Sequence, residues 1–279
     1  AVPSLMRRAA RTLSGQQPRP LHFHEQRDFD WHELERTVQT NGQWVQHDHH
    51  SQSGAFGLQR GSLPMHEDQL AVWERHHRLH AVAQVPFFRE RRYLLHQFPV
   101  LRTPGLRVLE VGCGNGSSVL PVLRGNETAR VHATDVSTAA VESMRQACER
   151  IGVADRLTSA AVHANDPVGK RQQPCEEGPF DAALLVFTAS AIPASGDAQC
   201  LQRIGQALRP GGVVCFRDYG LLDLRHLKDA AASSTDSAST CRALSDRTFL
   251  RAGGGFRRYY SVEDTSALAA AAGLTLAEP

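Results

Sequence analysis

The sequence has no long hydrophobic run, and this absence excludes one class of protein. No segment approaches the ~18 consecutive apolar residues of a membrane span, although 41% of the 279 residues are apolar. The six cysteines form neither a CxxC pair nor a zinc pattern, which favours a reducing compartment without disulfides. Net charge is also scarce, at +2, so charge alone does not indicate a nucleic-acid partner. We expect one α/β domain of ordinary size with an appendage.

Acidic residues are absent from the first 24 residues, which contain four arginines. The segment MRRAARTLS is typical of a mitochondrial presequence or a basic arm, and an unstructured basic tail is the alternative. A transit peptide is removed from a mature protein, which counts against the simplest form of the first interpretation. We expect a mitochondrial location, with the cytoplasm as the alternative.

Three glycines interrupt a run of apolar residues in the segment VLEVGCGNG, residues 108–116. The pattern predicts a buried strand, then a tight turn through Gly112, Gly114 and Gly116, and a helix from Ser117 onward. A dinucleotide site would have its third glycine where Ser117 stands, and no carboxylate at the place of Glu110. A glycine-rich turn in some other α/β protein is the alternative.

Strand and helix patterns alternate from residue 106 onward, which predicts a mostly parallel sheet wound on both faces. The expected strands are 106–111, 130–134, 157–163, 180–187 and 213–217; the expected helices are 117–124, 138–151, 198–208 and 262–272. Residues 231–240 are small and polar, which indicates a flexible insertion. We divide the chain into a basic arm (1–24), an extension with helices over 68–83 and 87–98 (25–104), and the α/β domain (105–279).

The spacing E-x-G-x-G-x-G resembles motif I of the class I S-adenosylmethionine-dependent methyltransferases. This resemblance implies a Rossmann-like fold with S-adenosylmethionine as cofactor. In that family the glycines let the amino-acid end of the cofactor lie against the backbone, and the acidic residue, here Glu110, helps to hold its ammonium group. Asp135 ends the second strand, where it can accept hydrogen bonds from both ribose hydroxyls, or alternatively cap the next helix. Asn165, with Asp166 beside it, falls where the family places a carboxylate against the adenine amino group.

Methyltransferases of this class normally close the sheet with a final antiparallel hairpin. Residues 274–276 read LTL, which is consistent with the first strand of such a hairpin, and the printed sequence stops at Pro279. We therefore expect either a missing terminus or a lost edge strand.

Three further blocks are similar to segments of the tRNA 3-methylcytidine methyltransferases. They are FRDYG (216–220), PFFRERRYLLHQFPVL (86–101) and FLRAGGGFRRYYSVED (249–264), so the resemblance covers about residues 73–276. It implies methylation of cytidine in tRNA. The alternative is a structural or assembly component of a mitochondrial ribonucleoprotein, with a protein partner. Four departures from the family pattern support that alternative: Asn165, Gly253 in place of an acidic residue, the absent hairpin and the basic extension.

Methylation of cytosine at ring nitrogen 3 needs no general base, because this nitrogen already carries a lone pair. Catalysis then consists mostly of alignment and exclusion of water. The ring becomes cationic, so a nearby carboxylate would stabilise the transition state. We predict this role for Asp218, with an ion pair to Arg217 or a helix cap as alternatives. Tyr219 and Phe187 are candidates for stacking on the flipped base, and core packing is the alternative for Tyr219.

A cluster of arginines lies among aromatic residues before the glycine turn. Arg89, Arg91 and Arg92 beside Phe88 suggest a surface for phosphates and stacked bases, with a solvated helix face as the alternative. The histidines show no acidic or cysteine partner at a suitable spacing, so we predict no metal site.

Overall fold

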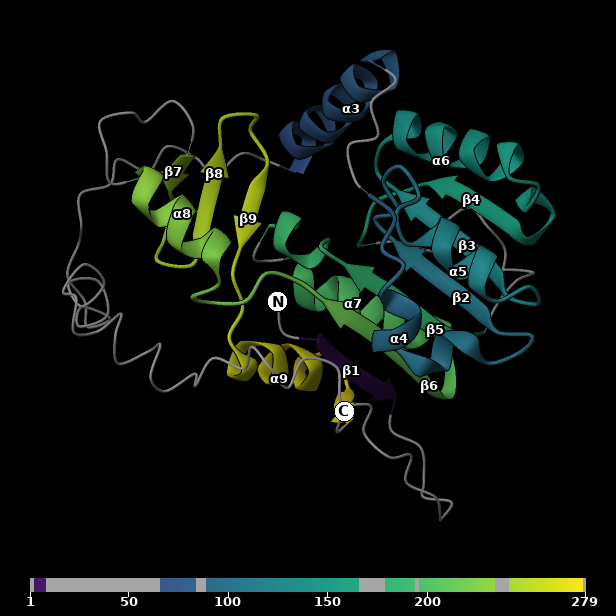
Figure 1. Cartoon of the computed structure of the whole chain (residues 1–279). Helices are drawn as coiled ribbons and strands as arrows, with labels where there is room; N and C mark the ends of the chain where they lie inside the picture. Colours follow the sequence, from purple (N-terminus) through teal and green to yellow (C-terminus); the bar gives the residue numbers. More distant parts are fainter. Residues whose placement is uncertain are drawn as a thin grey trace. The chain divides into compact units, whose positions relative to one another are not determined.

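The centre of the structure is a seven-stranded β-sheet in the order β10-β1-β6-β5-β2-β3-β4 (Figure 1). This computed structural model describes residues 3–8, 66–83, 89–165, 179–193, 196–233 and 241–277, all within one unit of the chain. The strands of the sheet are β1 (Pro3–Arg8), β2 (Arg107–Val111), β3 (Arg130–Asp135), β4 (Leu157–Ala161), β5 (Phe180–Val186), β6 (Leu208–Arg217) and β10 (Leu274–Ala277). Strands β6, β5, β2, β3 and β4 pair in parallel.

Helices cover both faces of this sheet, because alternate strand residues point to opposite faces. Leu184 and Cys215 enter one core, whereas Leu185 and Phe216 enter the other. The first core packs against α4 (Leu94–Gln97), α5 (Val119–Gly125) and α6 (Thr138–Arg150), and the second against α7 (Asp197–Ala207) and α9 (Val262–Ala271). The predicted Rossmann-like α/β fold, with a mostly parallel sheet wound on both faces, is confirmed.

Most predicted elements of the α/β domain agree with the structure. Each of the five predicted strands falls on an observed strand, and the four predicted helices of this domain agree within two residues. The 3₁₀ helices η1 (Pro99–Arg102), η2 (Ala154–Arg156) and η3 (Ala189–Ala191) were not predicted. Of the expected flexible insertion, residues 231–233 end a helix and 234–240 lie outside the described residues.

The helix predicted over 87–98 is wrong for most of its described part. Of residues 89–98, only α4 is helical. The backbone N–H of Arg91 donates to the carbonyl of Ser117 at 2.7 Å, so this part of the segment bonds to the glycine turn instead of to itself. The helix predicted over 68–83 is confirmed as α3 (His66–Ala83).

Strand β1 is a difference from the basic arm expected over residues 1–24. Its backbone lies between β6 and β10 and pairs antiparallel with both, with Leu5 opposite Cys215 and Ala277. An unpaired edge of β6 would leave a row of N–H and C=O groups without partners. The strand is missed from sequence because PSLMRR shows no clean alternation of apolar and polar residues.

A second, three-stranded antiparallel sheet lies beside the main one. It consists of β7 (Cys241–Ala243), β8 (Thr248–Arg251) and β9 (Phe256–Arg258), and α8 (Leu224–Ser233) packs on it (Figure 1). Its core is tied to α8 by Asp229, which accepts hydrogen bonds from the Arg257 guanidinium at 2.6 Å and the Tyr259 hydroxyl at 2.7 Å. We refer to β7–β9 with α8 as the small sheet unit.

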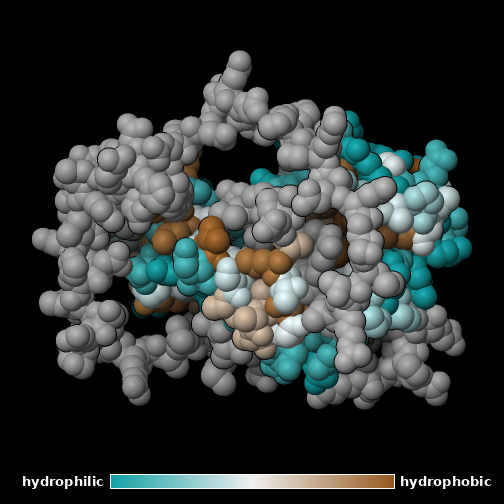
Figure 2. Space-filling model, turned by 90° about the horizontal axis from the view of Figure 1, so that it is seen from below, coloured by the Kyte–Doolittle hydropathy of each residue, from teal (hydrophilic) through white to brown (hydrophobic). Residues whose placement is uncertain are grey.

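Apolar surface is limited in the described part of the chain. No described helix combines the length and the hydrophobicity needed to cross a membrane. On the face in Figure 2, hydrophobic residues gather near the centre and hydrophilic residues lie around them. The exposed large hydrophobic side chains of the described part are Leu79, Tyr93, Leu224, Val262 and Leu276. Apolar residues exposed singly are ordinary for a folded domain.

Candidate functional site

The turn between β2 and α5 has the backbone that its glycines predict. Gly112, Gly114 and Gly116 all have positive φ, at 76°, 53° and 86°, a region that residues with a Cβ rarely adopt. The N–H groups of Gly112 and Cys113 both donate to the carbonyl of Thr134, at 2.8 and 2.9 Å. The turn is thereby fixed to the end of the neighbouring strand β3.

Only glycine fits at position 112, because there is no room for a Cβ. A Cβ added there would lie 2.4 Å from the side chain of Thr188, closer than any packed atoms. The Thr188 hydroxyl donates weakly to the carbonyl of Gly112 at 3.5 Å. The ends of β2 and β5 therefore approach each other at a point where only glycine fits.

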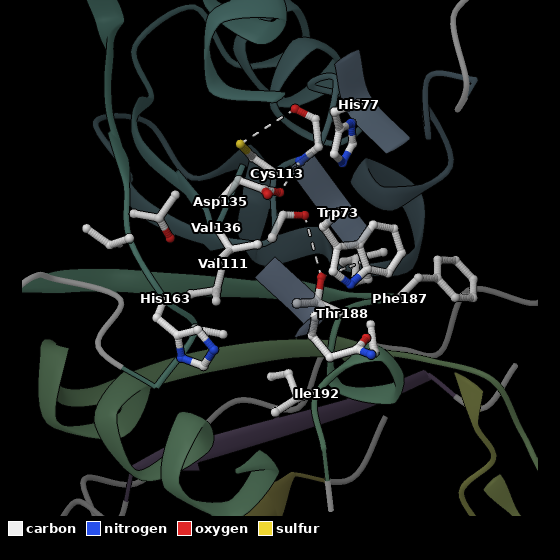
Figure 3. A pocket seen from close by; sticks show the side chains of 18 of the residues that line it. Trp73, His77, Val111, Cys113, Asp135, Val136, His163, Phe187, Thr188 and Ile192 are labelled. Atoms are coloured by element: carbon white, nitrogen blue, oxygen red, sulfur yellow. Dashed lines mark hydrogen bonds between the residues drawn. The ribbon is translucent and has the colours of Figure 1, made fainter. Parts of the chain in front are cut away.

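A pocket opens beside this turn, at the carboxyl ends of β2, β3 and β5 (Figure 3). In that view Asp135, Val136 and His163 lie on one side of it, and Trp73, His77 and Phe187 on the other. The pocket is lined by four residues of α3 (Gln69, Leu70, Trp73, His77), by Arg91, by the turn (Val111, Gly112, Cys113, Gly114, Ser117), by the β3 end (Thr134, Asp135, Val136), by Val162, His163 and Ala164, and by the β5 end (Val186, Phe187, Thr188, Ala191, Ile192, Pro193).

Asp135 lies in this pocket and is 8% exposed. One carboxylate oxygen accepts from the N–H of Gly114 at 2.9 Å, and the other accepts from the N–H of Ser137 at 3.0 Å. The true N-cap of α6 is Ser137, whose hydroxyl accepts from the N–H of Ala140. Asp135 therefore joins the glycine turn to the start of α6, and each of its oxygens keeps a second lone pair.

The sequence predicted that Asn165, with Asp166 beside it, would lie against the adenine amino group. The structure gives Asn165 other contacts. Asn165 does not line the pocket; its amide donates to Gln199 at 3.4 Å, and its backbone N–H donates to the His163 ring at 3.1 Å. His163 lines the pocket instead. Asp166 lies outside the described residues. Within HAND (163–166), the residue on the pocket wall is thus the histidine, which the motif comparison passed over.

Arg91 is not part of an exposed arginine surface. It is 9% exposed and lines the pocket, while Arg89 and Arg92 are exposed. Its guanidinium donates to the Ser118 hydroxyl at 2.8 Å and lies over the ring of Phe187, 5.2 Å from the centroid. Contacts distant in sequence bury Arg91, so of the three arginines predicted to contact RNA only Arg89 and Arg92 are exposed. Phe88 lies outside the described residues.

Glu110 does not line the pocket either. It projects from β2 toward the core that also contains Val108, and it is 1% exposed. The Ser118 hydroxyl hydrogen-bonds its carboxyl group, and the same hydroxyl accepts from Arg91. Burial raises the pKa of Glu110 to about 8, against the opposing effects of the Arg91 charge and the Ser118 hydrogen bond. Glu110 thus reaches the pocket wall only through Ser118 and Arg91.

Phe187 stands at the end of β5 with φ of 55°, a costly conformation for an aromatic residue. Its N–H donates to the carbonyl of Arg217 at 2.7 Å, which holds this backbone in place. The Phe187 ring lines the pocket and packs on Tyr219, with centroids 5.0 Å apart. The guanidinium of Arg257 lies 5.0 Å from the Tyr219 ring. Tyr219 therefore links the pocket wall to the small sheet unit.

Asp218 is buried at 2% exposure and is not among the residues that line the pocket. Its two oxygens accept from the N–H of Ser190 and its neighbour Tyr219, both at 2.9 Å. Burial raises its pKa to about 6, and the Ser190 hydrogen bonds oppose that shift. The predicted direct contact with a base is not supported by this placement. Asp218 instead holds η3, the segment next to the pocket residues Ala191 to Pro193.

Helix α3 supplies a wall of the pocket that the sequence analysis did not predict. At its middle, Glu74 accepts hydrogen bonds from the hydroxyls of Ser137 and Thr138 at 2.7 and 3.0 Å, and from the N–H of Ala139 at 3.4 Å. A carboxylate at the N-terminus of α6 is favoured there. Burial acts to raise the pKa of Glu74, but hydrogen bonds, including that from Ser137, outweigh it and lower the pKa to about 2.

The N-terminal half of α3 contacts the turn between β8 and β9. The Gln69 amide donates to the carbonyl of Gly254 at 2.9 Å, and Arg75 donates to that of Gly253 at 3.3 Å. A Cβ at Gly254 would lie 2.9 Å from Val72. Helix α3 is therefore bonded to α6 and to the small sheet unit. The sequence predicted the helix but not these contacts, because long-range contacts leave no local signal.

Comparison with known proteins agrees with this geometry. A family model described as "Methyltransferase domain" matches residues 108–212, which contain the glycine turn and Asp135. A crystal structure of an O-methyltransferase family 2 protein from Planctomyces limnophilus is 20% identical, with a TM-score of 0.50 over 71% of this chain and 55% of that one. The chain therefore contains a methyltransferase domain with the class I fold.

The relatives of the chain are more specific. It is 32% identical over 187 residues to a tRNA N(3)-methylcytidine methyltransferase of Schizosaccharomyces pombe, covering 64% of this chain and 56% of that protein. It is 32% identical over 161 residues to a tRNA N(3)-cytidine methyltransferase of Danio rerio, covering 57% and 41%. The chain thus spans only about half the length of these relatives. The resemblance predicted from the sequence blocks is confirmed: the chain is homologous to tRNA N(3)-cytidine methyltransferases.

The pKa of Glu110 makes stability depend on pH. A carboxyl group with pKa about 8 in the folded state and the usual 4.5 when unfolded binds more protons when folded between these values. Its contribution is fully present below pH 4.5 and is lost as pH rises toward 8. We expect Glu110→Gln, which resembles the protonated acid, to reduce this fall in the free energy of unfolding, measured by urea denaturation at pH 5 to 8. The exposed Glu127→Gln is the control, and an unchanged slope in Glu110→Gln would contradict the assignment.

The hydrogen bonds of Asp218 predict a structural effect of its amide variant. Asn offers one acceptor oxygen, and its NH₂ group cannot accept, so in Asp218→Asn the N–H of either Ser190 or Tyr219 loses its partner. We expect the free energy of unfolding to fall by ~1–3 kcal/mol, measured by urea denaturation. The exposed Asp155→Asn should leave stability unchanged. Wild-type stability in Asp218→Asn would show that these bonds do not hold η3.

Proposed function

We propose that this chain is an S-adenosylmethionine-dependent methyltransferase that forms 3-methylcytidine in tRNA. The observation that carries the proposal is the pocket itself. It is formed by a glycine turn in which Gly112 and Gly116 have no room for a Cβ, bonded through Asp135 to the end of the next strand, in a chain homologous to enzymes of this activity. The cofactor supplies an electrophilic methyl group when bound.

The residues of the pocket fit this cofactor. Arg91 is a buried cation on the wall, suited to the carboxylate of a methionine moiety. Asp135 offers acceptor lone pairs for ribose hydroxyls, and the segment around His163 borders the part of the pocket beyond Asp135.

The remaining residues position the reactants and exclude water. Cytosine ring nitrogen 3 attacks with its own lone pair, so no side chain has to remove a proton. Phe187 and Trp73 bring apolar rings to the pocket, where a planar base can be held. Asp218 enters the proposal as a positioning residue, because its two hydrogen bonds orient η3 and Tyr219. Catalysis is then chiefly alignment in a site from which water is displaced.

The alternative of a structural component has no observation in its favour among the described residues and the relatives reported above. A mitochondrial location and a protein partner stay predictions from the sequence. An intact cofactor pocket is not required of a scaffold, which is why cofactor binding is the most informative first experiment.

We expect wild-type protein to bind S-adenosylmethionine in calorimetry and Asp135→Ala to bind it at least about tenfold more weakly. The reason is the loss of charge-assisted hydrogen bonds worth ~1.5–3 kcal/mol. Asp155→Ala, which removes an exposed carboxylate, should bind normally. Equal affinity of Asp135→Ala and wild type would rule out the assignment of Asp135.

Methylation of a panel of tRNAs, read by mass spectrometry of digested RNA, tests the proposed reaction. Bound cofactor without any methylated tRNA would count against that reaction.

Contact with RNA is proposed for the exposed Arg89 and Arg92, without Arg91. Arg92 pairs with Glu90 at 3.2 Å, but its side chain is 80% exposed, so this pair is weak and can exchange for phosphate. We expect Arg89→Ala/Arg92→Ala to lower affinity for tRNA and to reduce the salt slope by ~0.7–0.9 per lost phosphate contact, measured by filter binding. The exposed Arg150→Ala is the matched control, and an unaltered slope in the double variant would place the RNA contact elsewhere.

A further inference from the structure

His77 is a buried polar side chain without a hydrogen-bonding partner among the described residues. It lies on the pocket wall and is 7% exposed. Its ring contacts are with Trp73, at a centroid distance of 6.1 Å, and with His76, at 5.5 Å. Because His77 lines the pocket, solvent or a polar group of a ligand can supply the hydrogen bonds that no described residue gives. Such a group on a pocket wall can take part in binding a ligand.

The environment of His77 determines which partner it can take. Burial lowers its pKa, the charges of Asp135 and Glu74 oppose this shift, and His80 adds to it. The imidazole is then neutral at pH 7, with one N–H donor and one nitrogen acceptor. A group that both donates and accepts, such as a hydroxyl, complements it better than a carboxylate or an ammonium group does.

The position of His77 specifies the part of the ligand. In Figure 3 His77 and Asp135 lie on either side of the turn at Cys113, and both line the pocket. The Asp135 charge acts to raise the pKa of His77. Asp135 can only accept, and one lone pair on each of its oxygens already receives a backbone N–H. A ribose presents two adjacent hydroxyl groups, so a second polar residue on the wall of the same pocket would be matched to the second hydroxyl.

We propose that His77 is a cofactor-binding residue, which hydrogen-bonds one ribose hydroxyl of S-adenosylmethionine while Asp135 accepts from the other. The inference rests on the proposed function and extends it, because it makes α3 a part of the cofactor site. The helix can hold His77 in register there, since Glu74 bonds it to the start of α6 and Gln69 bonds it to Gly254.

The test is a comparison of variants and ligands by calorimetry. His77→Phe keeps a planar ring and removes both nitrogens. Wild type and His77→Phe are titrated with S-adenosylhomocysteine and with its 2′-deoxy and 3′-deoxy forms. We expect His77→Phe to bind S-adenosylhomocysteine about threefold to tenfold more weakly, the range for one neutral hydrogen bond. For one of the two deoxy forms, wild type and variant should bind equally, because the hydroxyl that His77 bonds is then absent.

Two further variants separate this role from the docking of α3. Glu74→Gln weakens the contact with α6 and should reduce affinity by the same factor for all three ligands. Leu79→Ala, at an exposed position of the same helix, should change none. An equal loss for all three ligands in His77→Phe, or no loss at all, would overturn the proposal while leaving the proposed function intact. Failure of the wild-type protein to bind S-adenosylhomocysteine would overturn both.

Discussion

The arrangement of the site depends on one constraint, the close approach of β2 and β5 at Gly112. A Cβ there would lie 2.4 Å from Thr188, and the backbone follows a left-handed path with φ of 76°, so glycine meets two requirements at once. That path directs two N–H groups at the carbonyl of Thr134 and a third at Asp135. The backbone of the turn therefore cannot shift without losing these three hydrogen bonds to the end of β3. Side chains from elsewhere in the chain only complete it.

Features set by residues close together in the sequence could be predicted, whereas features set by distant residues could not. The glycine turn, the strands and Asp135 were predictable, because spacing and periodicity over a few residues determine them. The burial of Arg91 was not predictable, because it results from contacts with Ser118, 27 positions away, and with Phe187. Glu110 was assigned to the cofactor by its motif, yet its side chain is buried and does not line the pocket. Asn165 and His163 show the same limit: the motif located the segment but not the residue that faces inward.

The pocket is also coupled to parts of the fold that carry no recognisable cofactor motif. Tyr219 packs on Phe187 and under Arg257, which Asp229 neutralises inside the small sheet unit. Asp218, one residue earlier, bonds the backbone of η3. The FRDYG block is therefore a junction between the main sheet, the pocket wall and the small sheet unit.

Strand β1 has a consequence for how the chain reaches its structure. It covers one side of β6, and β10 can join the sheet only on the other side of β1. Contacts between Leu5 and Ala277 join segments that are among the most distant in the sequence, and closing so large a loop slows folding. Until β1 pairs with β6, the apolar strand β6 has an unpaired edge, a template for pairing with other chains. Residues 3–8 thus convert an exposed edge of β6 into a paired interior strand, which removes that template from the folded chain.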